Sequence, residues 1–163
     1  MYLDNIAAET GKAQPLGASL VQDGVNFAIF SRNATAVTLI IFESADPGSS
    51  WKEIPLNPNE NKTGNIWHCF IRGLGEGTCY LYRADGPYSP EKGQRFNVHK
   101  TLIDPYAKAL TDLSNWDYSK CAGYDLTKPG SDLTYSTVDD IDNQPRCIVI
   151  DDSFDWEDRK SVV

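Results

Sequence analysis

The chain has 163 residues, enough to bury the core of one domain or of one domain with a long excursion, but too few to hold a (β/α)₈ barrel as well, which takes about 250 residues. The net charge is −8 with a pI of about 4.6, and lysine and arginine are scattered rather than clustered, so nucleic acid is not an expected partner. No apolar run approaches the roughly 18 residues of a membrane span, and residues 1–12 lack the pattern of a secretion signal, so we expect no membrane partner and a cytoplasmic location.

Apolar residues alternate with a period of two in the first half of the chain, which is the pattern of β-strands. In residues 24–31, Val25, Phe27 and Ile29 share one face. Residues 36–43 repeat this scheme, and because both faces of both segments carry apolar side chains, we expect both faces to be covered. The predicted strands are residues 24–31, 36–43, 51–56, 66–71 and 78–83.

The connecting segments predict how these strands pair. Residues 31–35 form a short polar turn, which favours direct pairing of the two strands that flank it. Gly73, Gly75 and Gly77 separate the last two strands and predict a hairpin. Short strands at turn spacing, with hardly a helical stripe among them, indicate an all-β fold: an antiparallel β-sandwich of immunoglobulin-like type.

Residues 85–110 end the strand-rich half. Gly86-Pro87 and Ser89-Pro90 interrupt any strand because proline has no N–H to donate, and they place Tyr88 on a rigid turn. Asp104-Pro105 predicts the start of one short helical turn, in which Asp104 accepts the free N–H groups and Lys108 lies in the last turn.

The composition changes after Leu110. Residues 111–145 are polar and carry several aromatic side chains but few aliphatic ones, and a loop of this length usually has a purpose or a partner. Residues 147–150 form a last apolar strand before an acidic end. We therefore divide the chain into a sandwich core at residues 1–110, a loop excursion of the same domain at 111–145, and a last strand with a linker at 146–163.

The four cysteines indicate buried thiols. Cys69, Cys79, Cys121 and Cys147 form no C-x-x-C pair, and no histidine lies at the spacing of a zinc ligand. In a reducing compartment they are most simply free and buried.

No catalytic residue, metal site or cofactor is predicted. The acidic residues at 139–142 and 151–158 raise the alternative of calcium, but neither set has the central glycine and terminal glutamate of an EF-hand at the required spacing. His68 and His99 lie in no recognisable nucleophile or base motif.

A family resemblance is carried by segments that follow one another along most of the chain: PLGAS (15–19), GVNFAIFSRNAT (24–35), NIWHCFIRGL (65–74), YRADGPY (82–88), GQRFN followed by HK (93–100), LIDPYAKAL (102–110) and CIVIDDSFDWE (147–157). These closely resemble the N-terminal domain of glycogen-debranching and isoamylase-type enzymes of glycoside hydrolase family 13, the last segment resembling its exit toward the catalytic barrel. Thr101 stands where the family usually has an aliphatic residue.

The resemblance implies an early-set immunoglobulin-like sandwich without catalytic residues. It also implies a partner, the catalytic barrel of the same parent chain, which would hydrolyse α-1,6 branch linkages of glycogen or related α-glucans. This chain alone is then expected to be inactive. Branching, trehalose-releasing and pullulan-cleaving relatives share the domain type. Among these, the segments FSRNAT and DPYAKAL favour a debranching enzyme.

Aromatic side chains could give a sugar ring a flat platform. Trp67 and Tyr82 lie inside predicted strands and are expected in the core, whereas Trp51 follows a loop and Tyr88 a Gly-Pro turn, so both should be exposed. WKEIPL followed later by DGPY resembles the starch- and glycogen-binding modules of family 48, in which aromatics at these two places stack on glucose. Trp51 and Tyr88 are therefore the predicted carbohydrate-binding residues, although Leu81 stands where those modules carry a basic residue.

Two other classes of function stay open from the sequence. The chain could be a free-standing α-glucan-binding module, or a sandwich that mediates protein contacts only. The sequence encoded after Val163 discriminates between them, because a downstream barrel favours the debranching enzyme and a stop codon favours the other two.

Overall fold

The alternating apolar residues form β-strands, and the helical segments are short. The computed structural model describes residues 3–114 and 116–152, and no helix within them is long and apolar enough to cross a membrane. In chain order the elements are η1 (Leu3–Asn5), β1 (Gly17–Val21), β2 (Gly24–Phe30), β3 (Ala36–Phe42), β4 (Trp51–Pro55), β5 (Lys62–Thr63), β6 (Ile66–Arg72), β7 (Cys79–Asp85), β8 (Tyr88–Ser89), η2 (Pro90–Lys92), β9 (Gln94–Arg95), β10 (Ala109–Leu110), α1 (Tyr118–Cys121), η3 (Ser131–Leu133) and β11 (Cys147–Ile148).

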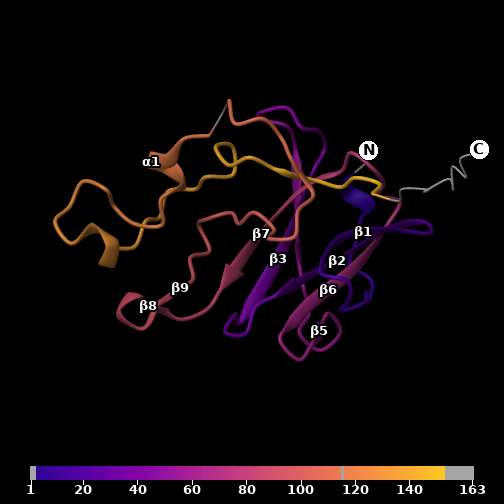
Figure 1. Ribbon diagram of the computed structural model, residues 1–163, viewed down its shortest axis with the longest axis horizontal. Coiled ribbons are helices and arrows are strands. Elements are labelled where there is room, and N and C mark those ends of the chain that lie inside the picture. The colour runs from indigo at the N-terminus through magenta and orange to yellow at the C-terminus, as the bar shows by residue number, and fades with distance from the viewer. Residues whose placement is uncertain (1–2, 115, 153–163) are drawn as a thin grey trace, which may run out of the picture.

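The strands form two sheets that pack face to face. In the described part of the chain, one sheet has the order β1-β2-β6-β5 and the other β10-β11-β7-β3-β4, while β8 and β9 make a small ribbon. The strand pairs within these sheets and the ribbon are antiparallel. Figure 1 shows the two sheets side by side, with most of the segment between β10 and β11 on the far side of the second sheet. The chain is therefore the all-β antiparallel sandwich that the sequence predicts.

The core lies between the two sheets and is rich in aromatic side chains. Phe27 of β2 meets Tyr80 of β7 across the interior, edge to face, with ring centroids 5.1 Å apart. Trp67 and Tyr82 are each only 1% exposed, which confirms the prediction that both belong to the core. Such pairs add to stability beyond the apolar area that they bury.

The predicted pairing of the strands is wrong in two places. β2 and β3 do not pair, because β2 lies between β1 and β6 whereas β3 lies between β4 and β7. The expected hairpin of β6 and β7 is likewise absent, since these strands belong to different sheets. Packed sheets are about 10 Å apart and five extended residues reach about 17 Å, so a short connection such as 31–35 can cross between sheets.

The helical turn expected after Asp104 is also wrong. The segment makes a single β-turn, in which the Ala107 amide donates to the Asp104 carbonyl at 3.0 Å. The Asp104 carboxylate accepts from the Tyr106 amide at 2.8 Å, as the sequence suggested, but Ala109 and Leu110 then continue as strand β10. Ala109 and Leu110 pair with Ile148 and Cys147 of β11, so their backbone groups bond another strand instead of a helical turn. The short α-helix lies instead at α1, capped by Asp117.

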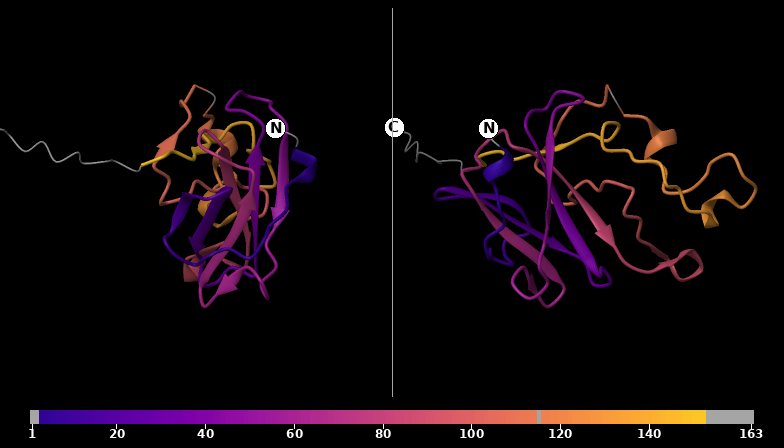
Figure 2. Two further views of the ribbon diagram at one scale, coloured as in Figure 1. Left: turned by 90° about the vertical axis from the view of Figure 1, so that its right-hand side faces the viewer. Right: turned by 180° about the vertical axis from the view of Figure 1, so that it is seen from behind.

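The excursion forms a third layer on the outer face of the five-stranded sheet (Figure 2). Asp139 contacts Arg83 of β7 at one end of this face, and Arg146 lies over the Phe42 ring of β3 at the other, with its guanidinium carbon 3.9 Å from the ring centroid. Residues 139–146 therefore cross the face. Beneath them Ile40 and Leu81 are fully buried, so both faces of β3 are covered, as the apolar pattern predicts.

Polar side chains of residues 88–100 hold the excursion in place. Tyr88, Arg95, Asn97 and Lys100 each donate to backbone carbonyl groups of the excursion, among them those of Thr134, Asp132, Ser136 and Val138. The Lys100 side chain is buried, and its ammonium group donates to two carbonyls, those of Lys120 and Val138. A loop poor in aliphatic residues is thus fixed through its backbone, which satisfies groups that would otherwise be buried without partners.

The last predicted strand is shorter than expected. β11 covers Cys147 and Ile148, and the Val149 amide continues by donating to the Thr78 carbonyl at 2.9 Å. Most of the linker predicted after it lies outside the described residues.

Candidate functional site

Trp51 begins β4, the edge strand of the five-stranded sheet. It pairs with Phe42 of β3, and because paired residues share a face, its side chain lies on the outer face of the sheet. The indole is 42% exposed. This position is compatible with stacking on the apolar face of a sugar ring.

Tyr88 is less exposed than its turn suggests. Its hydroxyl donates to the Thr134 carbonyl, and its ring meets the Tyr135 ring edge to face, with centroids 4.9 Å apart. The Tyr135 ring in turn meets the His99 ring edge to face, with centroids 6.0 Å apart. Tyr88 therefore belongs to an aromatic cluster that joins the β8–β9 ribbon to the excursion.

The structure does not bring Trp51 and Tyr88 together. Trp51 pairs with Phe42 at one end of β3, whereas Asp85, which precedes Tyr88, pairs with Ala36 at the other end. Six residues of a strand span about 20 Å, so a single glucose ring cannot contact both side chains. Leu81, which replaces the basic residue of the sugar-binding modules, lies on the face between them and is fully buried.

Arg83 fixes the excursion to the outer face of the five-stranded sheet. Its guanidinium donates to Glu53 of β4 at 3.1 Å, to both carboxylate oxygens of Asp139 at 2.8 and 3.0 Å, and to the Val98 carbonyl at 3.1 Å. The arginine side chain is 10% exposed, whereas the two carboxylates are about half exposed. One residue thereby ties β7, β4 and the excursion together.

Burial shifts the pKa values of interior thiols and of His68. Burial raises the pKa values of Cys69 and Cys147 to about 12, so their nucleophilic thiolate forms are not populated at neutral pH. Burial lowers the pKa of His68, whose Nε2 lies 2.8 Å from the Thr63 hydroxyl. Within residues 3–114 and 116–152, no group of three or more possible ligands could hold a metal ion.

Sequence reasoning missed Tyr135 as the neighbour of Tyr88, and His99 as the neighbour of Tyr135. The aromatic composition of residues 111–145 was a signal, but it does not show which ring returns to the ribbon. That depends on the reversal of the excursion, which is set by long-range hydrogen bonds such as Asn97 to the Ser136 carbonyl at 2.8 Å.

Comparison with known proteins matches residues 15–107 to the family model described as carbohydrate-binding module 48 (isoamylase N-terminal domain). The glycogen debranching enzyme of Dickeya chrysanthemi is 35% identical over 147 residues, which is 90% of this chain and 20% of that protein. The chloroplastic isoamylase SU1 of Zea mays is 45% identical over 103 residues, covering 61% of this chain and 13% of that protein. The chain thus spans a fifth or less of the length of these two relatives.

A solved structure shows the same fold at low sequence identity. It is the catalytic module of the multi-modular glycogen-degrading pneumococcal virulence factor SpuA, with a TM-score of 0.54 and 18% identity. The match covers 87% of this chain and 17% of that one.

Proposed function

The chain belongs to the carbohydrate-binding module 48 family, the isoamylase N-terminal domain, and on that premise we propose that it is the non-catalytic N-terminal domain of a glycogen-debranching enzyme of the isoamylase type. The observation that carries this proposal is the family match over residues 15–107, extended by relatives that align with nine-tenths of the chain. The parent enzyme would hydrolyse α-1,6 branch linkages in glycogen or related α-glucans, with two carboxyl groups about 5 Å apart in its catalytic barrel.

The proposed partner of the domain is that barrel. Most of the exposed large apolar side chains among the described residues lie in residues 98–138, including Leu126, Leu133 and Val138. A concentration of this kind is typical of a contact surface. We propose that residues 111–145 are a distinct excursion of the domain, which meets the barrel around Leu126 and Leu133, and that residues 146–163 lead toward the barrel.

We also propose that Trp51 and Tyr88 contact α-glucan, as two separate points rather than one platform. The exposure of Trp51 supports the first contact. No charge-assisted hydrogen bond is available from Leu81, so binding should be weak, on the order of millimolar, which corresponds to about 4 kcal/mol. The location proposed for the protein is the cytoplasm, a reducing compartment in which four free thiols are expected.

Activity tests the proposed function. The 163-residue chain should release no reducing sugar from glycogen, because the barrel with its carboxylate pair is absent. A protein extended through the sequence encoded after Val163 should release it. Turnover by the chain itself above a heat-killed control, surviving repurification, would contradict the proposal, as would an extended protein without a glycoside hydrolase barrel.

Titration with maltoheptaose tests the glucan contacts. The indole and tyrosine resonances are followed during the titration. Because the expected affinity is millimolar, the Trp51 indole resonance should have shifted at about tens of millimolar sugar. Trp51→Ala should abolish the accompanying shifts of the backbone amides around position 51 while costing little stability, because the residue is 42% exposed at the edge of the sheet. Tyr88→Phe is the matched control, because it keeps the aromatic ring and removes only the hydrogen bond to the Thr134 carbonyl. The ring resonances at position 88 should still shift when sugar is added. Unchanged resonances at these concentrations, or unfolding of Trp51→Ala, would mean that these aromatics are structural.

A further inference from the structure

A cavity lies at the base of the excursion, apart from Trp51 and Tyr88. Its volume is about 520 Å³, within the roughly 300–1,000 Å³ of small-molecule sites. It is lined by the β3–β4 loop at Asp46, by the start of the excursion at Asp112 and Trp116, and by the returning chain at Asp142 and Arg146. Three segments that are distant in sequence therefore converge on it.

Arg146 is a built part of this cavity rather than a mobile surface group. Its side chain is 4% exposed and lies against the Phe42 ring. Nη1 makes three hydrogen bonds, to the carbonyls of Ser44 and Asp46 and to the Ser49 hydroxyl, at 2.7, 2.9 and 2.7 Å. Nε and Nη2 donate to no group in the described part of the chain. Neither nitrogen is among the fully buried unpaired atoms of the described chain, so these N–H groups remain open to solvent and to a ligand in the cavity.

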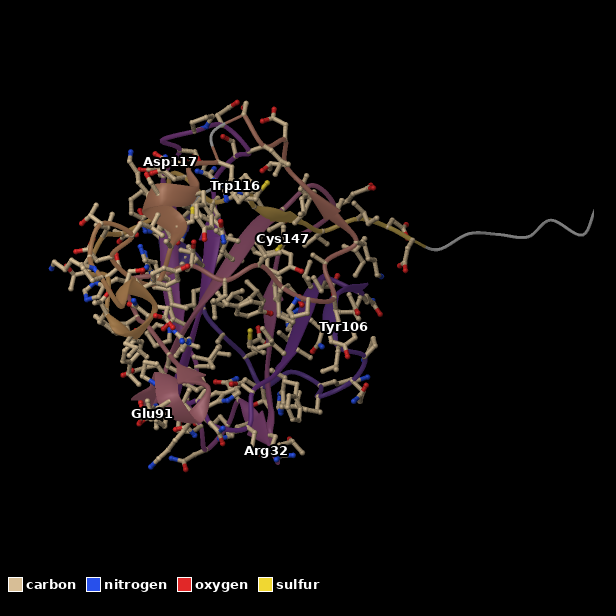
Figure 3. The ribbon with its side chains drawn as sticks, turned by 60° about the vertical axis from the view of Figure 1, so that its left-hand side comes forward. Arg32, Glu91, Tyr106, Trp116, Asp117 and Cys147 are labelled. Atoms are coloured by element: carbon tan, nitrogen blue, oxygen red, sulfur yellow. The ribbon has the colours of Figure 1, made fainter. Side chains whose placement is uncertain are left out.

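Trp116 supplies a flat apolar surface at the same place. It is 51% exposed, and its one ring contact in the described residues is the edge of Tyr118, with centroids 6.3 Å apart. Figure 3 shows Trp116 beside Asp117, at the start of α1. An indole that adds little to the core is free to stack on a ligand.

The charges of the lining decide the class of ligand. The lining carries three aspartates, Asp46, Asp112 and Asp142, against the single arginine Arg146, so its negative balance of charge disfavours an anion. A metal ion is not favoured either, since no group of three suitable ligands occurs in residues 3–114 and 116–152. Carboxylate acceptors, guanidinium donors and an exposed indole together suit a neutral polyhydroxyl compound with an apolar face, which is a sugar ring.

We propose that this cavity is a second saccharide-binding site of the domain, in which a glucose unit of an α-glucan stacks on Trp116 while its hydroxyls bond Arg146 and Asp142. The saccharide class rests on the cavity itself, whereas the choice of an α-glucan rests on the proposed function. The site is separate from Trp51, which does not line the cavity.

Maltoheptaose and cellohexaose, titrated in parallel into the ¹⁵N-labelled 163-residue chain, test the site. We expect a saturable shift of the Trp116 indole N–H with maltoheptaose at millimolar concentrations, and a response to cellohexaose at least three-fold weaker. In variants that lack this indole, the backbone amides of Asp142 and Arg146, which also line the cavity, report binding. Trp116→Ala should remove their shifts. Trp116→Phe keeps a smaller ring and should retain weaker shifts, which guards against a loss caused by misfolding.

Two further variants separate this site from its alternatives. Asp142→Asn removes one carboxylate and should weaken the Trp116 response at least three-fold, whereas Trp51→Ala should leave it unchanged. No shift of Trp116, or a shift indifferent to Asp142→Asn, overturns the site. An equal response to cellohexaose overturns the α-glucan assignment, and because activity of the extended protein is measured separately, that result leaves the proposed function standing.

Discussion

At the scale of single residues, Arg83 and Arg72 show that the contribution of an ion pair to stability depends on how exposed the pair is. Both arginines contact carboxylates at 3.1 Å or less. The side chain of Arg72 is 61% exposed, so water and salt screen its pair with Glu9. Arg83 is 10% exposed and also satisfies the Val98 carbonyl, so its loss leaves acceptors without a donor.

We therefore predict that Arg83→Met lowers the free energy of unfolding by about 2 kcal/mol, the scale of losing hydrogen bonds to a charged group. Urea unfolding followed by tryptophan fluorescence measures the change. Arg72→Met is the matched control, with the same substitution at an exposed pair, and its unfolding midpoint should not move measurably. Equal midpoints for the two variants would show that the Arg83 contacts do not stabilise the fold.

At the scale of elements, the sequence located the strands well and their partners poorly. The period-two pattern placed β2, β3, β4, β6 and β7 within a few residues, because alternation is a local property of each segment. Pairing is not local. Since β2 and β3 are apolar on both faces, the pattern could not show which strand would lie beside which, and a short turn serves both a hairpin and a crossing between sheets.

The GQRFN-HK segment gives a second example at this scale. Its polar residues indicated a loop, but their partners are backbone carbonyls more than 20 residues away, such as those that Asn97 and Lys100 reach. Trp51 was correctly expected at an exposed position, whereas Tyr88 was expected to be exposed and is half-buried by the excursion. Exposure at the edge of a sheet is predictable from local signals, and cover by a distant loop is not.

At the scale of the whole molecule, the sandwich needs the excursion to cover its second sheet. Without residues 139–146, the side chains of Ile40, Phe42 and Leu81 would face water. Each large apolar side chain contributes about 2 kcal/mol when buried, so their exposure opposes folding and favours association.

We predict that replacing residues 112–145 by Asn-Gly, which keeps Thr111 beside Arg146, produces a chain that binds a hydrophobic dye, self-associates and unfolds at lower urea concentration. Size-exclusion chromatography with light scattering and dye fluorescence measure these changes. Replacing only residues 126–129 by Gly-Gly is the control, since this tip lies away from the face, and should leave both readings unchanged. A monomeric, dye-free chain after the long deletion would show that the sandwich does not depend on its third layer.

The ladder between β10 and β11 has an evolutionary consequence. Leu110 and Cys147 are direct partners in it, so the chain leaves the sandwich and returns to it at neighbouring positions. The residues between them can be lengthened or shortened at the tip without moving either strand, and each doubling of a flexible loop costs only about 0.6 kcal/mol. Descendants of one ancestral sandwich can therefore acquire differently shaped excursions, each fitted to a different neighbour, while the fold that carries them is inherited unchanged.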